Sequence, residues 1–371
     1  MIQPIVPIYL YHDLGASEQA VGVITALMAF TSVFLRVPCA VCIKGRKILA
    51  ATVLGLGLNA FSLFGYGLSW SPLIFAVFRA VHGAAIALNY TLLLSLSSMI
   101  AQDDRLDEAV TGYTISLALG LWLGPAFGTV LRSFIGLREF MFAASTLAII
   151  SVLGGLVLLI DLRKTWPKTV SSERLSLRDL MKPVNINASL IFLSFIFAFG
   201  ALSAYAPIKA KLELGLTDQV IMLLFTLYFF IVFVMRLLLL KARKLRSSIG
   251  ALKLLALSLG IGGLGLIILG LGWNFPLFVL GLCLAGSAHG MVFPLTASLI
   301  AKETPPQLRV VGNSIYLTSS DLGNLLGPVF VSGMLGFTSL SISLAAASIP
   351  PLLGLLAAKK LRNLGGKLTN I

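Results

Sequence analysis

The sequence predicts an all-α membrane protein of about twelve transmembrane helices, built as two parallel six-helix repeats. The chain has 371 residues, of which 58% are hydrophobic and 11% are charged, whereas soluble domains are roughly 45–50% apolar and 25% charged. Many apolar runs reach the roughly 20 residues that a helix needs to cross a bilayer. Short motifs of the first half also recur in the second half at a nearly constant spacing.

The apolar runs define the expected helices. Residues 2–10 are apolar but too short to cross a bilayer. We expect them to form the second half of a first helix truncated at its N-terminus, because the start site is wrong or because this helix is short. A polar stretch, residues 161–186, is the expected cytoplasmic loop between halves at 1–160 and 187–371. The other helices are expected at residues 19–37, 48–69, 72–99, 109–131, 140–160, 187–208, 219–240, 250–272, 276–300, 310–334 and 338–358.

Four short motifs recur in the same order in both halves. The repeated pairs are LGASEQ (14–19) with LGLTDQ (214–219), Arg36 with Arg236, His82-Gly83 with His289-Gly290, and GLWLGP (120–125) with GNLLGP (323–328). The spacing stays between 200 and 207 residues, so both halves run in the same orientation. Parallel halves with a site between them at the middle of the membrane are one known transporter architecture.

The positive charge of the chain is distributed asymmetrically. The net charge is +14, and 20 of the Lys and Arg residues fall in the loops of one side and in the C-terminal tail, against 4 in the loops of the other side. This bias predicts that the even-numbered loops and the C-terminus are cytoplasmic. We therefore expect a multi-pass protein of the plasma membrane, with the lipid bilayer rather than nucleic acid as its partner.

The chain resembles the major facilitator superfamily over nearly its whole length. The family motif GxxxDRxGRK, between helices 2 and 3, is matched by Gly45, Arg46 and Lys47, while Pro38, Cys42 and Ile43 replace its glycine, aspartate and arginine. Arg79 and Gly83 match the family's Arg-x-x-x-Gly of helix 4. The resemblance implies alternating access around a cavity lined by helices 1, 4, 7 and 10 and their neighbours 5 and 11.

A helix 5 pattern of the family is found mainly in proton-driven exporters. It is similar to the run containing Gly120, Gly124, Pro125 and Gly128. Together with the run 321–328, this resemblance favours the drug- and sugar-efflux branch. Gly120 and Gly124, like Gly323 and Gly327 before Pro328, are also spaced for close helix packing. Because proline bends helices, we expect tight, bent contacts between the two halves at these runs.

Polar residues inside apolar runs are the candidate site. A charge in a membrane costs about 2.5–3.5 kcal/mol, so Arg79 and Asp321 are expected to face a cavity. Arg79 is a candidate for a substrate or proton-path cation, or for a structural residue near the membrane edge. Asp321 is the one acid expected deep in a helix, as a proton carrier or as a structural hydrogen-bonding group. The full candidate set is Arg79, His82, Asn89, Tyr90, Tyr205, His289, Asn313, Tyr316, Asp321 and Asn324.

These observations favour a secondary transporter. We expect it to export a small organic solute in exchange for protons, as a monomer. The sequence contains no recognisable set of a nucleophile, a base and a residue that orients the base, so an enzyme is not expected. No cofactor is expected, and no metal is expected because no third ligand accompanies His82 and His289. The alternatives are an uptake symporter or facilitative carrier of a sugar or metabolite, and a non-transporting sensor built on a transporter scaffold.

Overall fold

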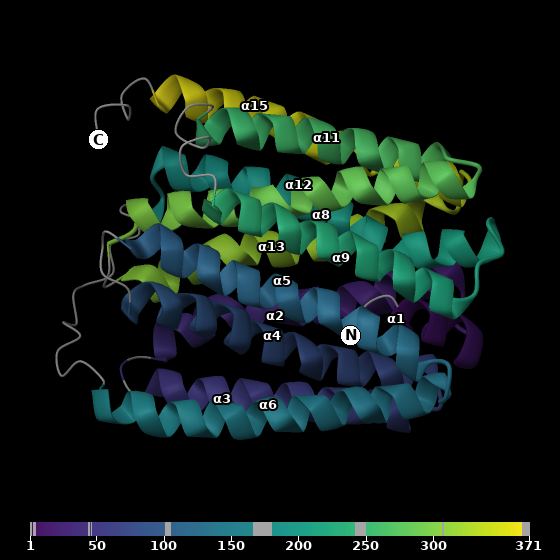
Figure 1. Cartoon of the computed structure of the whole chain (residues 1–371), viewed down its shortest axis with the longest axis horizontal. Helices are drawn as coiled ribbons and strands as arrows, with labels where there is room; N and C mark the ends of the chain where they lie inside the picture. Colours follow the sequence, from purple (N-terminus) through teal and green to yellow (C-terminus); the bar gives the residue numbers. More distant parts are fainter. Residues whose placement is uncertain are drawn as a thin grey trace.

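The computed structural model describes residues 2, 5–43, 45, 47–100, 105–165, 180–241, 250–305 and 308–365. This part of the chain is helical and contains no strand. The helices run side by side along the long axis of the molecule (Figure 1). They are α1 (Ile5–Ile8), the π-helix η1 (Tyr9–Asp13), α2 (Glu18–Cys42), α3 (Lys47–Leu68), α4 (Pro72–Ile100), α5 (Leu106–Leu131), α6 (Leu137–Thr165), α8 (Pro183–Leu212), α9 (Asp218–Lys241), α11 (Ala251–Leu271), α12 (Phe275–Glu303), α13 (Arg309–Met334), α14 (Leu340–Ala346) and α15 (Ile349–Gly365).

Twelve helices result when α1 is joined to η1 and α14 to α15, which confirms the predicted fold class. Within the described ranges, ten helical segments are long and apolar enough to cross a membrane. The segment α1–η1 is too short to count among them, and α13 is absent because it carries many polar residues on its buried face. The turn between α14 and α15 precedes Pro350 and Pro351, whose nitrogens donate no hydrogen bond.

Several helices extend further than the apolar runs predicted. Helix α2 continues through Pro38 to Cys42 instead of ending at residue 37, because neighbouring helices can compensate a proline in a membrane helix. Helix α6 continues to Thr165, and α8 begins at Pro183. Residues 161–165 and 183–186 of the expected central loop therefore form helix ends, and residues 166–179 lie outside the described residues.

The repeated motif before α2 and α9 forms the same turn twice. Gly15 and Gly215 adopt left-handed backbone conformations, with φ of 69° and 64°, which glycine adopts without steric cost. The Ala16 amide donates to the Leu10 carbonyl over 2.8 Å, and the Leu216 amide donates to the Ala210 carbonyl over 3.0 Å. Equal spacing in the sequence thus corresponds to equal local geometry in the two halves.

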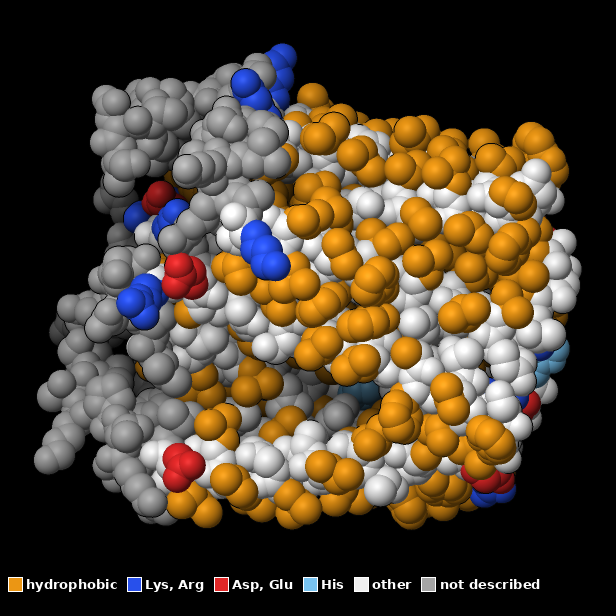
Figure 2. Space-filling view, viewed as in Figure 1, with side chains coloured by type: hydrophobic (Ala, Val, Ile, Leu, Met, Phe, Trp, Pro, Cys, Tyr) orange, Lys and Arg blue, Asp and Glu red, His pale blue; other side chains and the backbone are white. Residues whose placement is uncertain are grey.

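The two halves meet along α2, α4, α5, α8, α9, α12 and α13, while α3 and α6 lie at one edge and α11 and α15 at the other (Figure 1). The described charged side chains visible in Figure 2 gather near the ends of the helices, and a broad band between them is apolar. We call the end with the α2–α3 and α12–α13 connections and the C-terminus the basic end, and the other end the opposite end. An apolar band bounded by charged ends is the pattern expected of a protein inserted in a bilayer.

The predicted close contact between the halves at the glycine motifs is wrong for most of these glycines. A Cβ on Gly323 would lie 2.8 Å from the Leu193 carbonyl oxygen, and one on Gly327 would lie 2.1 Å from that of Phe197. Both glycines therefore pack against α8, inside the second half. A Cβ on Gly120 would meet nothing within 4 Å. Gly128 does face the other half, since its Cβ would meet the side chain of Met222 on α9.

Candidate functional site

A central cavity of about 100 Å³ lies where the two halves meet. Helices α2, α4 and α5 of the first half and α8, α9, α12 and α13 of the second half line it. Its polar lining includes Arg36, Tyr90, Arg236, His289, Ser320, Asp321 and Asn324, and its apolar lining includes Phe192, Phe199 and Phe293. The expected lining included helices 4, 5, 7, 10 and 11, which are α4, α5, α8, α12 and α13. It also included helix 1, which contributes no residue to this cavity in the described part of the chain. The structure adds α2 and α9, the second helix of each half.

A buried ion pair joins the halves beside this cavity. Arg36 of α2 donates from Nε to Asp321 Oδ2 over 2.6 Å and from Nη2 to Asp321 Oδ1 over 2.8 Å. Ser32 Oγ donates to Asp321 Oδ2 over 2.8 Å, and Arg36 Nη1 donates to Thr91 Oγ1 over 2.9 Å. The side chains of Arg36 and Asp321 are 1% and 6% exposed. This two-point geometry is the strong form of an arginine–carboxylate contact.

A second arginine in the cavity, Arg236 of α9, is paired very differently. Its side chain is fully buried. Nη1 donates to the Thr114 carbonyl of α5, in the other half, and the guanidinium carbon lies 5.4 Å from the centre of the Phe293 ring. Nε and Nη2 have no hydrogen-bond partner in the described part of the chain.

The polar residues of helix 4 do not act as one stripe. Arg79 and His82 form a small network with α3, in which Tyr66 Oη lies 3.3 Å from Arg79 Nη1 and 2.9 Å from His82 Nδ1. Arg79 does not line the central cavity. Tyr90, further along α4, does line it, and Asn89 faces a separate groove described below.

The polar residues of helix 11 also separate into groups. Asp321 and Asn324 face the central cavity, as does His289 of α12, whose Nδ1 lies 2.9 Å from Tyr228 Oη. Asn313 donates to Ser95 Oγ of α4 over 3.4 Å, nearer the basic end. Tyr316 bonds to Thr296 inside the second half over 2.6 Å.

Tyr205, the remaining candidate, lies away from the cavity. It donates to the Glu18 carbonyl over 3.2 Å and so joins α8 to the start of α2 at the opposite end.

A larger groove of about 830 Å³ lies inside the first half, between α3, α4, α5 and α6. Figure 2 shows the surface hollowed there, between α5 and α6. His82, Asn89, Tyr90, Gly120 and Gly124 line it. The internal repeat matches α3, α4, α5 and α6 of the first half with α11, α12, α13 and α15 of the second half, and α8 packs among these last four helices. The groove of the first half therefore lies at the position that α8 fills in the second half.

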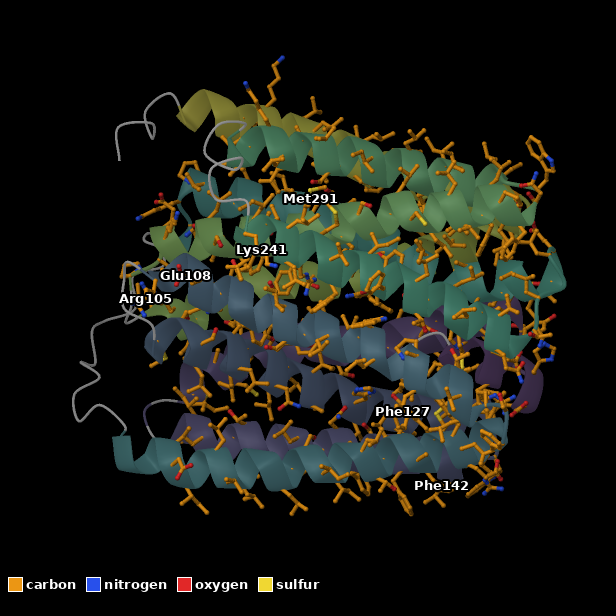
Figure 3. All side chains as sticks on the ribbon, viewed as in Figure 1. Arg105, Glu108, Phe127, Phe142, Lys241 and Met291 are labelled. Atoms are coloured by element: carbon orange, nitrogen blue, oxygen red, sulfur yellow. The ribbon has the colours of Figure 1, made fainter. Side chains whose placement is uncertain are left out.

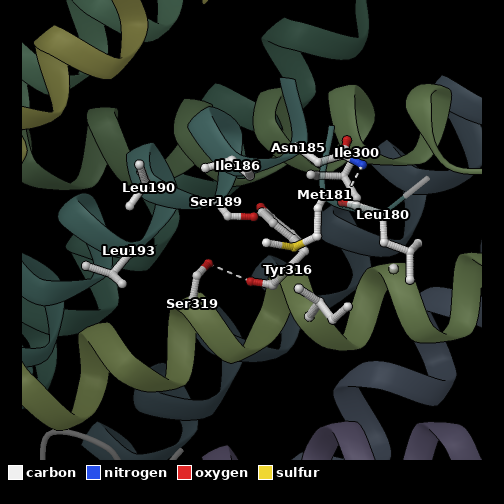
Figure 4. Close-up of a pocket in the computed structure, with 12 residues that line it drawn as sticks. Leu180, Met181, Asn185, Ile186, Ser189, Leu190, Leu193, Ile300, Tyr316 and Ser319 are labelled. Carbon is white, nitrogen blue, oxygen red and sulfur yellow. Dashed lines mark hydrogen bonds between the residues drawn. The ribbon is translucent and has the colours of Figure 1, made fainter. Parts of the chain in front are cut away.

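A third cavity, of about 190 Å³, lies between α8 and α13 (Figure 4). Asn185, Ser189, Tyr316 and Ser319 provide its polar side chains, and Ser319 Oγ donates to the Tyr316 carbonyl over 2.5 Å. Among the described residues, neither a charged side chain nor a residue of the first half lines this cavity. The central cavity, by contrast, is lined by both halves and contains the buried Arg36–Asp321 pair, so it is the better candidate for a transport site.

The motif between α2 and α3 is partly described. Gly45 forms a turn with φ of 57°, Lys47 begins α3, and Arg46 lies outside the described residues. Pro125 and Pro328 lie inside α5 and α13. Among the described residues, no group of His, Cys, Asp and Glu is placed to hold a metal ion.

Sequence reasoning missed both cavity arginines as site residues, although the repeat had matched Arg36 with Arg236. The expected helices ended at residues 37 and 240, which placed Arg36 at a helix end. The structure adds five residues after position 37, or roughly 8 Å of helix at 1.5 Å per residue. A charge that recurs at one position of both halves was the signal that could have identified them.

The fold and the charged cavity between two six-helix halves define a membrane transporter. The family model described as Major Facilitator Superfamily matches residues 1–328. The chain therefore belongs to the major facilitator superfamily.

Relatives and solved structures agree with this assignment. An uncharacterised MFS-type transporter of Methanocaldococcus jannaschii is 24% identical over 355 residues, covering 91% of this chain and 88% of the relative. The crystal structure of the human organic anion transporter MFSD10 superposes with a TM-score of 0.71 at 16% identity, covering 96% of this chain and 94% of that one. A bacterial homologue of the human lysosomal transporter Spinster, inward-facing and unoccupied, gives 0.67 at 16% identity, covering 96% and 92%. At these identities the structural matches show the fold alone.

Proposed function

We propose that this transporter is driven by protons and that Asp321 carries the proton. The observation that supports this proposal is the buried Arg36–Asp321 pair, which joins α2 of one half to α13 of the other. A carboxylate can exist with or without its proton, whereas an arginine stays charged. Protonation of Asp321 therefore removes the ionic part of a contact between the halves.

The proposed cycle couples that contact to movement. With Asp321 ionised, the pair and the hydrogen bond from Ser32 to Asp321 hold α2 against α13, and Arg36 also donates to Thr91 of α4. With Asp321 protonated, Arg36 loses its counter-charge and the halves are freer to separate. Tyr90, Arg236 and His289 line the same cavity beside this pair.

Contacts at both ends indicate an occluded state of alternating access. At the basic end, Arg309 Nη1 of α13 donates to the Ser98 carbonyl of α4 over 2.9 Å. At the opposite end, Ser332 donates to the Gln19 carbonyl over 3.2 Å, and Arg132 pairs with Asp218 over 3.2 Å. Opening the cavity to one side requires breaking one of these two sets.

We further propose that transport is outward across the plasma membrane, with the basic end in the cytoplasm. The exporter-like run 120–128 supports the direction, and the excess of Lys and Arg in the loops of one side supports the orientation. Trp273, which is 81% exposed in a loop of the opposite end, is a suitable position at which to test this orientation. A cysteine placed there should react with a membrane-impermeant maleimide added outside cells.

The test is reconstitution in liposomes with a pH gradient and a fluorescent pH probe inside. We expect a panel of drugs, sugars and organic acids to contain a solute whose addition moves protons. The variant Asp321→Asn should reduce this coupled flux to the level of protein-free liposomes, because asparagine is neutral at every pH.

The matched control is Asp161→Asn, which removes an exposed carboxylate from α6 far from the cavity lining. It should leave coupled flux unchanged. Solute flux without protons in the unmodified chain would contradict proton coupling and favour facilitated diffusion. Binding of solutes without any flux would favour a sensor.

A further inference from the structure

We propose that Arg236 is the binding group for the carboxylate of an organic anion that occupies the central cavity. The inference rests on the proposed transport function, because it assigns the substrate class of the same cavity. The binding site is the unpartnered edge of the Arg236 guanidinium, formed by Nε and Nη2.

The internal repeat supplies a direct comparison. Arg36 and Arg236 are separated by 200 residues and occupy the same position in α2 and α9. Arg36 uses the Nε–Nη2 edge to hold both oxygens of Asp321, at 2.6 and 2.8 Å, and uses Nη1 for Thr91. Arg236 uses Nη1 for the Thr114 carbonyl and leaves the Nε–Nη2 edge without a partner in the described part of the chain. The two edges are chemically identical, and one of them already holds a carboxylate.

The acid that would complete the second pair is missing from the chain. The runs GLWLGP and GNLLGP align α5 with α13 at a shift of 203 residues, which places Ala118 opposite Asp321. Ala118 is fully buried and lies one helical turn after Thr114, the residue that contacts Arg236. A buried cation without a counter-charge is strongly unfavourable. An anionic ligand at this position would supply the charge that alanine does not.

The surroundings of Arg236 indicate the form of the ligand. Within the cavity lining, Arg36 and Asp321 balance each other, so Arg236 leaves an excess of one positive charge. The guanidinium edge presents two parallel donors, which match a carboxylate better than a spherical ion such as chloride. Phe192, Phe199 and Phe293 surround the cavity. A small monocarboxylate with an apolar or aromatic body fits these features.

Benzoate is the probe for the first experiment. Its equilibrium binding to the purified full-length chain is measured by dialysis of the radiolabelled acid, with benzyl alcohol, benzylamine and chloride as competitors. We expect saturable benzoate binding that none of the three competitors displaces. Arg236→Gln should weaken binding at least about tenfold, as expected for the loss of a charge-assisted contact. Arg236→Lys, which keeps the charge but loses the two-donor edge, should retain part of the affinity.

The matched control for lost charge is Lys241→Gln, on the same helix but exposed at its basic end (Figure 3). It should bind benzoate normally. A second pair of variants does not depend on removing Arg236. Ala118→Asp should supply the internal counter-charge and exclude benzoate, whereas Ala118→Asn, of nearly equal size, should still bind it.

Three results would each overturn the proposal: no benzoate binding by the folded chain, equal competition by benzyl alcohol, or unchanged binding in Arg236→Gln. Because dialysis needs no pH gradient, the result of the binding experiment does not depend on the result of the flux assay. Benzoate binding without flux would contradict transport and leave the anion site standing. Proton-linked flux of another solute, with benzoate binding insensitive to Arg236, would contradict the anion site alone.

Discussion

At the scale of single residues, the two cavity arginines show what a membrane interior tolerates. Arg36 donates to the Asp321 carboxylate and to the hydroxyl groups of Ser32 and Thr91, so its burial is compensated. Arg236 has one carbonyl and one aromatic ring. Ionisable groups inside membrane segments usually mark a function, and the poorly compensated arginine is the stronger indication of a ligand.

The Arg36–Asp321 pair makes a prediction about stability. Arg36→Gln should lower the free energy of unfolding by about 3–5 kcal/mol, because it leaves the Asp321 carboxylate buried without a cation. The double variant Arg36→Gln/Asp321→Asn should be more stable than Arg36→Gln alone, since it leaves no buried carboxylate without its hydrogen-bonded partner. Thermal unfolding of the detergent-solubilised variants at pH 7 measures both effects. A double variant that loses the sum of the two single losses would show that the residues are not coupled.

Sequence reasoning identified Asp321, Asn324, Tyr90 and His289, which the structure places at the central cavity. It could identify them because polar residues stand out in apolar runs. It could not show that Arg79 bonds to Tyr66 on a neighbouring helix. The helical periodicity of a sequence shows which residues share one face of a helix, but it does not show which neighbouring helix that face contacts. It also could not show that Arg36 and Asp321, 285 residues apart, are partners. Roles for these residues remain predictions.

At the scale of helices, glycine positions decide how closely two helices approach. Gly83 of α4 packs against the Met28 carbonyl of α2, and Gly290 of α12 packs against the Val232 carbonyl of α9. The repeated His-Gly pair thus holds the same two helices together in each half. The later glycines of α13 act similarly, against α8. Glycine spacing predicts a close contact, but it does not name the partner helix.

Two alanine substitutions test this packing. Gly327→Ala should destabilise the protein by about 1–3 kcal/mol, because its Cβ would lie 2.1 Å from the Phe197 carbonyl oxygen and 2.9 Å from the Ala201 nitrogen, so the backbone must move. Gly120→Ala should be neutral or stabilising by about 0.5–1 kcal/mol, because its Cβ meets nothing and alanine favours the helix. Thermal unfolding in detergent compares the two. Equal losses would contradict the packing assignment.

Helix existence was predicted well, and helix length less well. Apolar runs of about 20 residues specify membrane helices almost by themselves, because the bilayer requires satisfied backbone groups. Boundaries depend on contacts outside the bilayer core. The helix expected at residues 19–37 continues through Pro38 to Cys42, and α8, expected from residue 187, begins at Pro183.

At the scale of the whole molecule, the halves are joined at three levels. Arg309 and Asn313 contact α4 at the basic end, Arg36 and Asp321 pair beside the central cavity, and Ser332 and Tyr205 contact the start of α2 at the opposite end. Alternating access requires the contacts at the two ends to open in turn around the central cavity.

Cross-links at the two ends test this requirement. In a chain with Cys39, Cys42 and Cys283 replaced by serine, the pair Gln19→Cys/Ser332→Cys joins α2 to α13 at the opposite end, where Ser332 now bonds to the Gln19 carbonyl. The pair Ser95→Cys/Asn313→Cys joins α4 to α13 at the basic end. Oxidation of either pair should stop flux in liposomes, and a reductant should restore it, because each disulfide holds one side closed. Ala60→Cys/Ser145→Cys, which links α3 to α6 inside the first half, should leave flux unchanged. Full flux through a chain cross-linked at one end would show that the halves need not separate there and would contradict alternating access by their relative movement.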